Sequence, residues 1–163
     1  MFLLQEKSLG NDLIFDNIYN EGQWGVNPNG KSTSGAGSHA KAVINPYIIK
    51  IIDFLLEKRP SIIVDLGCGD FNVGKYFPAY ADQYIACDVS KIILKRNKNK
   101  FSSLGNVDFR SLDLNKNDLP EGDVCFIRQV LQHLSNADIL HFVNKLNLST
   151  PYKYLIVTEH LPK

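Results

Sequence analysis

Short apolar runs and longer amphipathic stretches alternate along this chain. Five runs rich in β-branched and aromatic residues have the length of strands: residues 61–64, 84–88, 107–114, 124–127 and 152–158. The stretches between them carry helical spacing or helix-start signals: residues 13–19, a helix that begins at Pro46 and ends at Arg59-Pro60, residues 73–81, a lysine-rich helix opened by Ser90, and a helix opened by Ser135 that ends before Thr150-Pro151. This alternation predicts an α/β fold with a parallel sheet, whose ligands bind at the carboxyl ends of the strands.

The boundary between the first strand and the loop after it carries the strongest chemical signal. Residues 64–74 read VDLGCGDFNVG, so an apolar strand ends in Asp65 and runs into a glycine turn. Gly67 and Gly69 have no Cβ, which lets the chain turn sharply and present its N–H groups to a ligand. We therefore expect a nucleotide or nucleoside site at this edge of the sheet.

The spacing of the glycines bears on which nucleotide is bound. A dinucleotide fingerprint has glycines at its first, third and sixth places, which here are Gly67, Gly69 and Asn72. Without the third glycine, a pyrophosphate-binding helix would be held farther from the strand, which disfavours a nicotinamide or flavin. An NAD-dependent enzyme of sugar metabolism is therefore kept only as an alternative.

Two later strands also end in acids. Asp88 follows the second strand about 20 residues after the glycine turn, the spacing expected for a carboxylate that accepts hydrogen bonds from two ribose hydroxyls. Asp113 lies beside Leu114 at the end of the third strand. The structural alternatives are that Asp65 and Asp88 cap the following helices and that Asp113 serves a polar turn.

At these positions the chain resembles the class I S-adenosylmethionine-dependent methyltransferases. Their first motif has an acid and two glycines at the spacing of Asp65, Gly67 and Gly69, and the resemblance covers residues 61–158. Members of that family often have another glycine where this chain has Phe71, which is a departure. The resemblance implies S-adenosylmethionine as the cofactor and a Rossmann-like, three-layer α/β/α fold with strand order 3-2-1-4-5.

The cofactor-binding positions implied by the resemblance lie in the glycine turn and after the following strands. They are Asp65, Gly67, Cys68, Gly69, Asp88, Val89, Asp113, Leu114 and Arg128. Asp65 would hold the methionine ammonium, Asp88 the ribose and Asp113 the adenine. Cys68 would serve as a small residue, because no helper base stands at a recognisable spacing. Arg128 would hold the cofactor carboxylate or an acidic acceptor, and its structural alternative is an ion pair with a nearby acid.

Residues 128–135 follow the fourth strand, and in the resembled family this segment lies beside the methyl group and lines the acceptor pocket. His133 is the candidate general base, because an imidazole titrates near neutrality. A base is needed only if the acceptor must lose a proton, since methyl transfer from a sulfonium depends mainly on orientation. The structural alternative for His133 is a hydrogen bond within its own loop.

Residues 21–38 string together turn-forming residues. Trp24, the only tryptophan, favours a lid over a disordered linker, because linkers are poor in aromatic residues. More narrowly, Trp24-Gly25 and the Ser-Gly-x-Gly-Ser motif at residues 34–38 resemble bacterial methyltransferases of which some lie with surface-polysaccharide genes. Trp24, Ser38 and Gln132 are therefore candidate residues for binding a small-molecule or carbohydrate acceptor.

Composition limits the class of protein. With 163 residues, 44% of them hydrophobic and 21% charged, the chain has room for one domain, with an N-terminal helix and lid over residues 1–45 and the core over residues 46–163. The formal net charge of +1 makes a nucleic-acid partner unexpected, and the lysines of residues 91–100 are interpreted as a solvated helix face. Three cysteines show no zinc or disulfide spacing, and no apolar run approaches a membrane span, so we expect a soluble cytoplasmic protein without a metal.

The chain stops a few residues after the fifth strand. The resembled family adds one helix and an antiparallel strand pair there, so we expect either a truncated chain or an unusually short member. If the chain is truncated, the fifth strand would be an exposed edge that can pair with a second copy in a homodimer. The leading hypothesis is a methyltransferase acting on oxygen or nitrogen of a small molecule or carbohydrate, and the alternatives are an NAD-dependent enzyme and a non-catalytic nucleoside-binding module.

Overall fold

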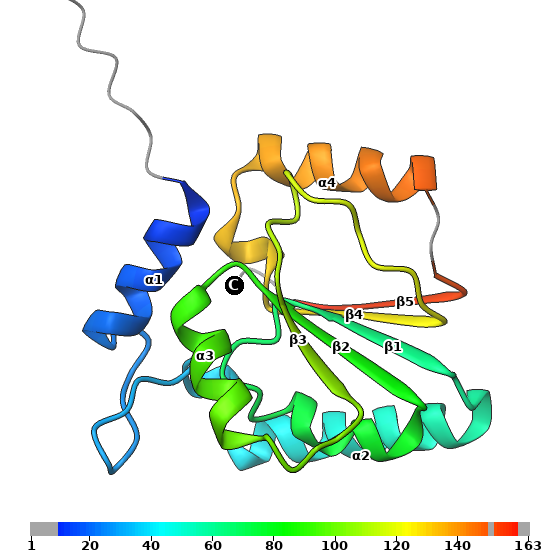
Figure 1. Ribbon diagram of the computed structural model, residues 1–163, viewed down its shortest axis with the longest axis horizontal. Coiled ribbons are helices and arrows are strands. Elements are labelled where there is room, and N and C mark those ends of the chain that lie inside the picture. Colours follow the sequence, from blue (N-terminus) through cyan, green and yellow to red (C-terminus); the bar gives the residue numbers. More distant parts are fainter. Residues whose placement is uncertain (1–9, 150–151, 160–163) are drawn as a thin grey trace, which may run out of the picture.

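The computed structural model of the chain describes residues 10–149 and 152–159 (Figure 1). Its centre is a sheet of five strands: β1 (Ile62–Leu66), β2 (Gln83–Asp88), β3 (Val107–Ser111), β4 (Val124–Arg128) and β5 (Tyr154–Thr158). The strand order is β3-β2-β1-β4-β5, and every neighbouring pair in this sheet is parallel. The predicted parallel sheet and its strand order are confirmed.

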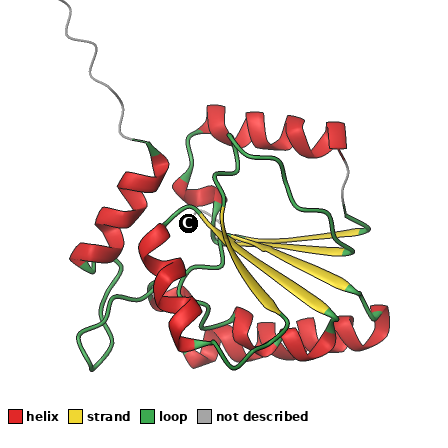
Figure 2. Cartoon of the chain, in the orientation of Figure 1, coloured by secondary structure: helices red, strands yellow, loops and turns green. Residues whose placement is uncertain are grey.

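Helices cover both faces of the sheet, which gives the predicted three layers (Figure 2). α2 (Lys41–Lys58) and α3 (Lys91–Lys100) pack on one face, and α4 (Asn136–Ser149) packs on the other. Successive strand residues point to opposite faces, so Ile63 joins the core under α2 while Val64 joins the core under α4. Burial of β1, β2 and β4 on both faces explains why their sequences read as continuous apolar runs.

Two helix predictions need correction, and both concern proline. α2 begins at Lys41 rather than at Pro46, because Ile44 extends the buried stripe of the helix by one turn and Pro46 costs only one backbone hydrogen bond so near the start. Residues 73–81 form two short 3₁₀ turns, Gly74–Tyr76 and Pro78–Tyr80, instead of one helix. Pro78 has no N–H with which to continue the first turn.

The N-terminal segment folds against the carboxyl edge of the sheet. α1 (Asn11–Glu21) lies beside α3, and Asp16 Oδ1 accepts a hydrogen bond of 2.6 Å from the Ser90 hydroxyl (Figure 1). The chain then crosses back through a bridge between Val26 and Ser32 to a 3₁₀ turn at Ala36–Ser38. We call residues 34–39 the strap. The predicted lid is thus an ordered segment with its own backbone hydrogen bonds.

β5 forms one edge of the sheet and pairs only with β4 among the described residues. Leu155 and Val157 on this strand are 43% and 48% exposed, so the edge is apolar as expected. The homodimer stays a prediction. A separate finding is that none of the described helices combines the length and apolar character needed to cross a bilayer.

Candidate functional site

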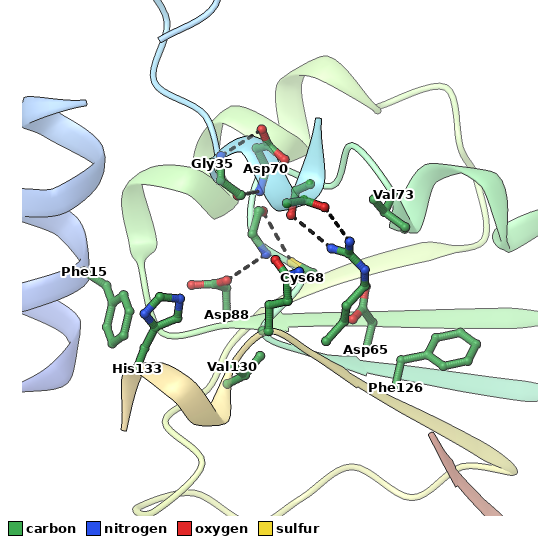
Figure 3. A pocket seen from close by; sticks show the side chains of 18 of the residues that line it. Phe15, Gly35, Asp65, Cys68, Asp70, Val73, Asp88, Phe126, Val130 and His133 are labelled. Atoms are coloured by element: carbon green, nitrogen blue, oxygen red, sulfur yellow. Dashed lines mark hydrogen bonds between the residues drawn. The ribbon is translucent and has the colours of Figure 1, made fainter. Parts of the chain in front are cut away.

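A cavity of about 380 Å³ opens at the carboxyl ends of β1, β2 and β4 (Figure 3). Its walls come from the glycine turn, the strap, α1 and the segment after β4. Every site residue proposed from the sequence contributes to this lining: Trp24, Ser38, Asp65, Gly67, Cys68, Gly69, Asp88, Val89, Asp113, Leu114, Arg128, Gln132 and His133. Residues up to 109 positions apart in the chain, Trp24 and His133, therefore meet around one space.

The glycine turn needs its glycines. Gly67 and Gly69 have φ of 85° and 54°, and a Cβ at these positions would collide with Val130 and with Ser34 Oγ respectively. The expectation that the turn presents free N–H groups is wrong. Gly67 N and Cys68 N both donate to Cys87 O at 2.8 Å, and Gly69 N donates to Asp88 Oδ2 at 2.9 Å, because the turn closes onto the end of β2. A ligand would meet the turn through close approach to its glycines.

Phe71 keeps the shape of the turn although it stands where the resembled family often has glycine. Its φ is 59°, a conformation that costs a non-glycine residue about 1 to 3 kcal/mol. Its ring is fully buried, with centroids 5.5, 5.2 and 5.0 Å from those of Tyr84, Phe101 and Phe109. Burying such a ring contributes roughly 1.5 to 3 kcal/mol, which offsets the strain. Phe71 therefore adopts a left-handed conformation that a glycine would adopt without strain.

Asp65 lies within β1, one residue before its end, and only 7% of it is exposed. The Tyr84 hydroxyl donates to its Oδ2 at 2.9 Å. Burial raises the pKa of Asp65 to about 7, the Tyr84 hydrogen bond opposes this shift, and the charge of Asp88 adds to it. The ionised carboxylate is thus disfavoured until a cation approaches it.

Asp88 ends β2 and ties two loops together. Its Oδ2 accepts from Gly69 N and its Oδ1 from Ser90 N, each at 2.9 Å. Burial raises its pKa to about 6 against these backbone hydrogen bonds. Ser90, not Asp88, caps α3 by accepting from Ile93 N at 3.3 Å. Each Asp88 oxygen has a further lone-pair direction, so both can still accept a hydrogen bond from a ligand.

Asp113 is the least committed of the three acids. β3 ends at Ser111, so Asp113 and Leu114 lie in the following loop rather than in the strand as predicted. Asp113 Oδ1 accepts from Asn115 N at 3.0 Å, and Oδ2 lies 3.2 Å from Lys116 Nζ. The residue therefore organises its turn and also lines the cavity.

Arg128 reaches from the end of β4 to the strap. Its guanidinium donates to Ser38 Oγ at 3.1 Å and to Gly37 O at 2.6 Å, and it lies 5.2 Å from the Tyr47 ring centroid. Burial lowers its pKa, while the charges of Tyr47, Asp65 and Glu159 oppose that shift. Its Nε is buried and has no hydrogen-bond partner among the described residues, which leaves donor capacity beside the cavity.

The strap is tied across the glycine loop by residues that the sequence analysis did not single out. Ser34 and Asp70 bond each other twice, Asp70 N to Ser34 Oγ at 2.8 Å and Ser34 N to Asp70 Oδ2 at 3.2 Å. His39 Nε2 lies 2.5 Å from the same Asp70 oxygen, and the Tyr19 hydroxyl lies 2.9 Å from Ser34 Oγ. The only signal in the sequence was the serine that opens the Ser-Gly-x-Gly-Ser motif.

Asn72 has a use that explains why no glycine stands there. Its Nδ2 donates to Ser38 O at 2.8 Å and its Oδ1 accepts from Lys75 Nζ at 2.9 Å. A glycine could make neither bond. The same residue that disfavours a dinucleotide motif therefore fastens the strap.

Three rings form a wall at the side of the cavity. The Trp24 centroid lies 4.8 Å from that of His133 and 5.8 Å from that of Phe15, and Phe15 faces His133 in Figure 3. Burial lowers the pKa of His133, and the charge of Glu159 opposes this shift. The imidazole is thus neutral at pH 7 and can accept a proton. Its contact with Gln132 Nε2, at 3.3 Å, matches the alternative of a loop hydrogen bond.

The cysteines are free thiols: Cys68, Cys87 and Cys125. Burial raises the pKa of Cys68 well above its usual range, so its reactive thiolate is disfavoured. Within the part of the chain that the structure describes, no group of three or more His, Cys, Asp or Glu side chains is arranged to hold a metal ion.

Comparison with known proteins identifies the family. A family model described as a methyltransferase domain matches residues 64–149, more than half of the chain. The search of curated proteins found no match. Magnesium protoporphyrin IX methyltransferase from Synechocystis PCC 6803, solved with bound SAM, is 15% identical with a TM-score of 0.68 over 93% of this chain and 76% of that one.

Two other solved structures show the same fold. The methyltransferase domain of a bacterial CtHen1 is 20% identical with a TM-score of 0.60, over 68% of this chain and 63% of that one. An S-adenosylmethionine-dependent methyltransferase from Clostridium acetobutylicum ATCC 824 is 19% identical with a TM-score of 0.59, over 75% of this chain and 53% of that one. The chain thus spans less than two thirds of the length of either protein. It belongs to the class I S-adenosylmethionine-dependent methyltransferase family.

Proposed function

We propose that this chain binds S-adenosylmethionine in the cavity at the carboxyl edge and transfers its methyl group to oxygen or nitrogen of a small molecule. The observation that carries the proposal is the pair of buried acids at neighbouring strand ends, Asp65 and Asp88, beside a glycine turn. The cofactor has a cationic amine and a ribose diol. Both features complement carboxylates whose charged form is disfavoured by burial.

Each lining residue has a role in this proposal. Asp65 pairs with the amine of the cofactor, and the two oxygens of Asp88 accept from the ribose hydroxyls. Arg128 binds the carboxylate with donor capacity that its strap contacts leave unused. The glycine turn with Cys68 allows the methionine part to approach the backbone. The adenine is bounded by a remaining set of side chains: Val89, Asp113 and Leu114.

The chain's own contribution to chemistry is orientation and exclusion of water. The bound sulfonium supplies an activated methyl group, so the protein has to align an acceptor with it. The strap covers the cavity and is fastened on both sides, by Asp70 and by Arg128. Such a cover shields the reactants from solvent.

We assign the acceptor to the small-molecule class, with a carbohydrate as the favoured case. Trp24 offers a ring face, and Ser38 and Gln132 offer a hydroxyl and an amide that suit a hydroxyl-bearing ring. A net charge of +1 supplies no field for a polyanion, which disfavours a nucleic-acid acceptor. Proteins of the same fold include the small RNA methyltransferase HEN1 and magnesium protoporphyrin IX methyltransferase, so fold alone does not select the acceptor.

His133 is proposed as the base that takes a proton from a hydroxyl acceptor. Its neutral imidazole at the cavity wall supports this role. We expect His133→Ala to leave S-adenosylhomocysteine binding near normal and to slow turnover by about 10²- to 10⁴-fold where a proton must move. Full activity of this variant with a hydroxyl acceptor would reduce His133 to a structural residue.

Calorimetry and product detection test the proposal in two steps. We expect heat of binding with S-adenosylmethionine and S-adenosylhomocysteine and none with NAD, and then formation of S-adenosylhomocysteine when candidate acceptors are added. Binding of NAD in preference would support the dinucleotide alternative. Binding of the cofactor without turnover across amine, hydroxyl and sugar acceptors would favour a non-catalytic nucleoside-binding module.

A further inference from the structure

Glu159 lies directly after β5 and does not contribute to the lining of the cavity. Its Oε1 accepts two consecutive backbone hydrogen bonds, from Val130 N at 2.8 Å and from Leu131 N at 2.9 Å. The preceding amide, Gln129 N, donates to Thr158 O at 2.7 Å. The end of β5 therefore holds three successive amides of the turn after β4.

This turn carries two side chains that line the proposed cofactor site, Val130 and His133. The Val130 side chain lies where a Cβ on Gly67 would be, so it packs directly on the glycine turn. The 3₁₀ turn Leu131–His133 then brings His133 to Trp24. Val130 and His133 lie on the same segment in Figure 3. Any movement of the amides held by Glu159 would displace both side chains together.

The turn after β4 must be stabilised by contacts with other segments because its backbone is strained. Gln129 has φ of 55°, a conformation that an L-residue adopts at a cost unless its surroundings fix it. A carboxylate that accepts two N–H groups supplies charge-assisted hydrogen bonds, which are among the stronger ones in proteins. Glu159 also interacts with two groups of the site at longer range, since its charge raises the pKa of both His133 and Arg128.

We propose that Glu159 is a positioning residue of the methyl-transfer site, which sets Val130 against the glycine turn and His133 against Trp24 through the two amides it binds. This inference rests on the proposed function for its catalytic meaning. The placement of the turn by the Glu159 carboxylate can be measured without the cofactor.

The chain contains a matched control at the opposite end of the sheet. Asp123 Oδ2 also accepts two consecutive amides, Ser61 N at 2.8 Å and Ile62 N at 3.0 Å. Asp123 precedes β4 at the amino edge and takes no part in lining the cavity. Loss of this carboxylate removes the same kind of contact from a place that cannot affect the site directly.

The experiment compares Glu159→Met, Glu159→Gln and Asp123→Leu with the parent chain. Met and Leu keep approximate size and delete the acceptor, whereas Gln keeps a carbonyl oxygen that can accept both N–H groups. The measurements are the Kd for S-adenosylhomocysteine by calorimetry, the emission of Trp24 as the single tryptophan, the melting temperature, and hydrogen exchange of the Val130 and Leu131 amides.

We expect Glu159→Met to raise the Kd by about tenfold, to change Trp24 emission and to speed exchange at both amides, the tenfold figure corresponding to one lost charged hydrogen bond. Glu159→Gln should restore most of the affinity and the parent emission. Asp123→Leu should lower the melting temperature and leave Kd and emission unchanged.

Parent-like emission and exchange in Glu159→Met, or an equal loss of affinity in Asp123→Leu, would overturn the proposal. If Glu159→Met does not fold, the parent and Glu159→Gln give the same decision: the Val130 and Leu131 amides should exchange slowly in the parent and moderately faster in Glu159→Gln, which keeps the acceptor without its charge. Unprotected amides in the parent overturn the proposal. A parent chain that binds no S-adenosylhomocysteine would instead refute the proposed function, because emission and exchange report the turn independently.

Discussion

The two edges of the sheet use the same residue type in opposite ways. At the carboxyl edge, burial raises the pKa of Asp65 to about 7 and that of Asp88 to about 6. At the amino edge, a hydrogen bond from Lys153 and backbone N–H groups hold the pKa of Asp123 below its usual range. Asp123 is paired with the exposed Lys153 of the same chain, 2.7 Å away, whereas the direct partner of Asp65 is a tyrosine hydroxyl and the charge of Arg128 acts on it only at longer range.

The difference separates a structural acid from a binding acid. A carboxylate that is already paired contributes its charge energy to folding, so little is left for a ligand. A buried carboxylate without a cation lowers the stability of the ligand-free protein and recovers that free energy when a cation binds. Perturbed acids of this kind cluster at functional sites, and among the described residues the two acids with a raised pKa lie at the carboxyl edge.

Left-handed backbone occurs at both edges, and at the carboxyl edge it gives the largest expected effect. Phe71 at the carboxyl edge has φ of 59° and a fully buried ring. Phe71→Ala keeps the strained backbone and loses the ring, so we expect the free energy of unfolding to fall by about 3 to 5 kcal/mol. Urea unfolding measures this fall in the free energy of unfolding. A loss below 1 kcal/mol would mean that the ring does not hold the turn.

The next effect concerns the ribose contact. Asp88→Ala removes the acceptor for Gly69 N and, in the proposed function, the acceptor for both ribose hydroxyls. Each hydrogen bond to a charged group is worth about 1.5 to 3 kcal/mol, less what water restores. We expect binding of S-adenosylhomocysteine to be lost in calorimetry. Asp88→Asn is the control that keeps one acceptor oxygen, and unchanged affinity in Asp88→Ala would remove the residue from the site.

A smaller effect is expected for the pH dependence of binding, which depends on Asp65 at the carboxyl edge. With a pKa of about 7, Asp65 is mostly ionised at pH 8 and mostly protonated at pH 6. The affinity for S-adenosylhomocysteine should therefore fall about tenfold as the pH is lowered from 8 to 6. Asp65→Asn should flatten this dependence. Titration calorimetry at several pH values checks it, and a pH-independent Kd in the parent would contradict pairing of Asp65 with the ammonium.

Stability without ligand should show the opposite trend. The raised pKa of Asp65 lets the native protein keep a proton that the unfolded chain releases, so its free energy of unfolding should fall as pH rises from about 4 to 7. The lowered pKa of Asp123 acts in reverse, and its contribution is lost as pH falls below about 4. Thermal melts of the parent, Asp65→Asn and Asp123→Asn separate the two contributions.

The smallest effect is expected at the amino edge. Arg59 ends α2 with φ of 47°, is exposed, and donates its N–H to Leu55 O. Glycine adopts this left-handed conformation without cost, so Arg59→Gly should stabilise the protein by up to about 1 kcal/mol. Cofactor affinity should not change. Weaker binding in this variant would show that the two edges are coupled.

Sequence patterns were sufficient for the sheet and its acids. The apolar runs rich in β-branched residues predicted the strands directly. The parallel arrangement then predicted that Asp65 and Asp88 lie at the same edge of the sheet, where both line the cavity. The site residues derived from motif spacing all line one cavity, although their roles stay predictions.

The contacts that the sequence did not reveal join residues far apart in the chain. Ser34 meets Asp70 and Glu159 meets Val130 through single polar atoms, and such pairs have no periodicity along the sequence. Pro46 misled the prediction of α2 for a related reason. Its local signal for a helix start was outweighed by burial of Ile44, which depends on the sheet packed beneath it.

If the cofactor binds at the glycine turn as proposed, the ring of Phe71 makes ligand affinity depend on packing in the hydrophobic core. Glycine would permit the left-handed turn by itself, whereas Phe71 holds it only while Phe101 and Phe109 pack against its ring. A directed-evolution library screened for altered cofactor affinity should therefore return substitutions at Phe101 and Phe109, neither of which lines the cavity. In this chain, laboratory selection for binding and laboratory selection for thermostability would act on the same aromatic cluster.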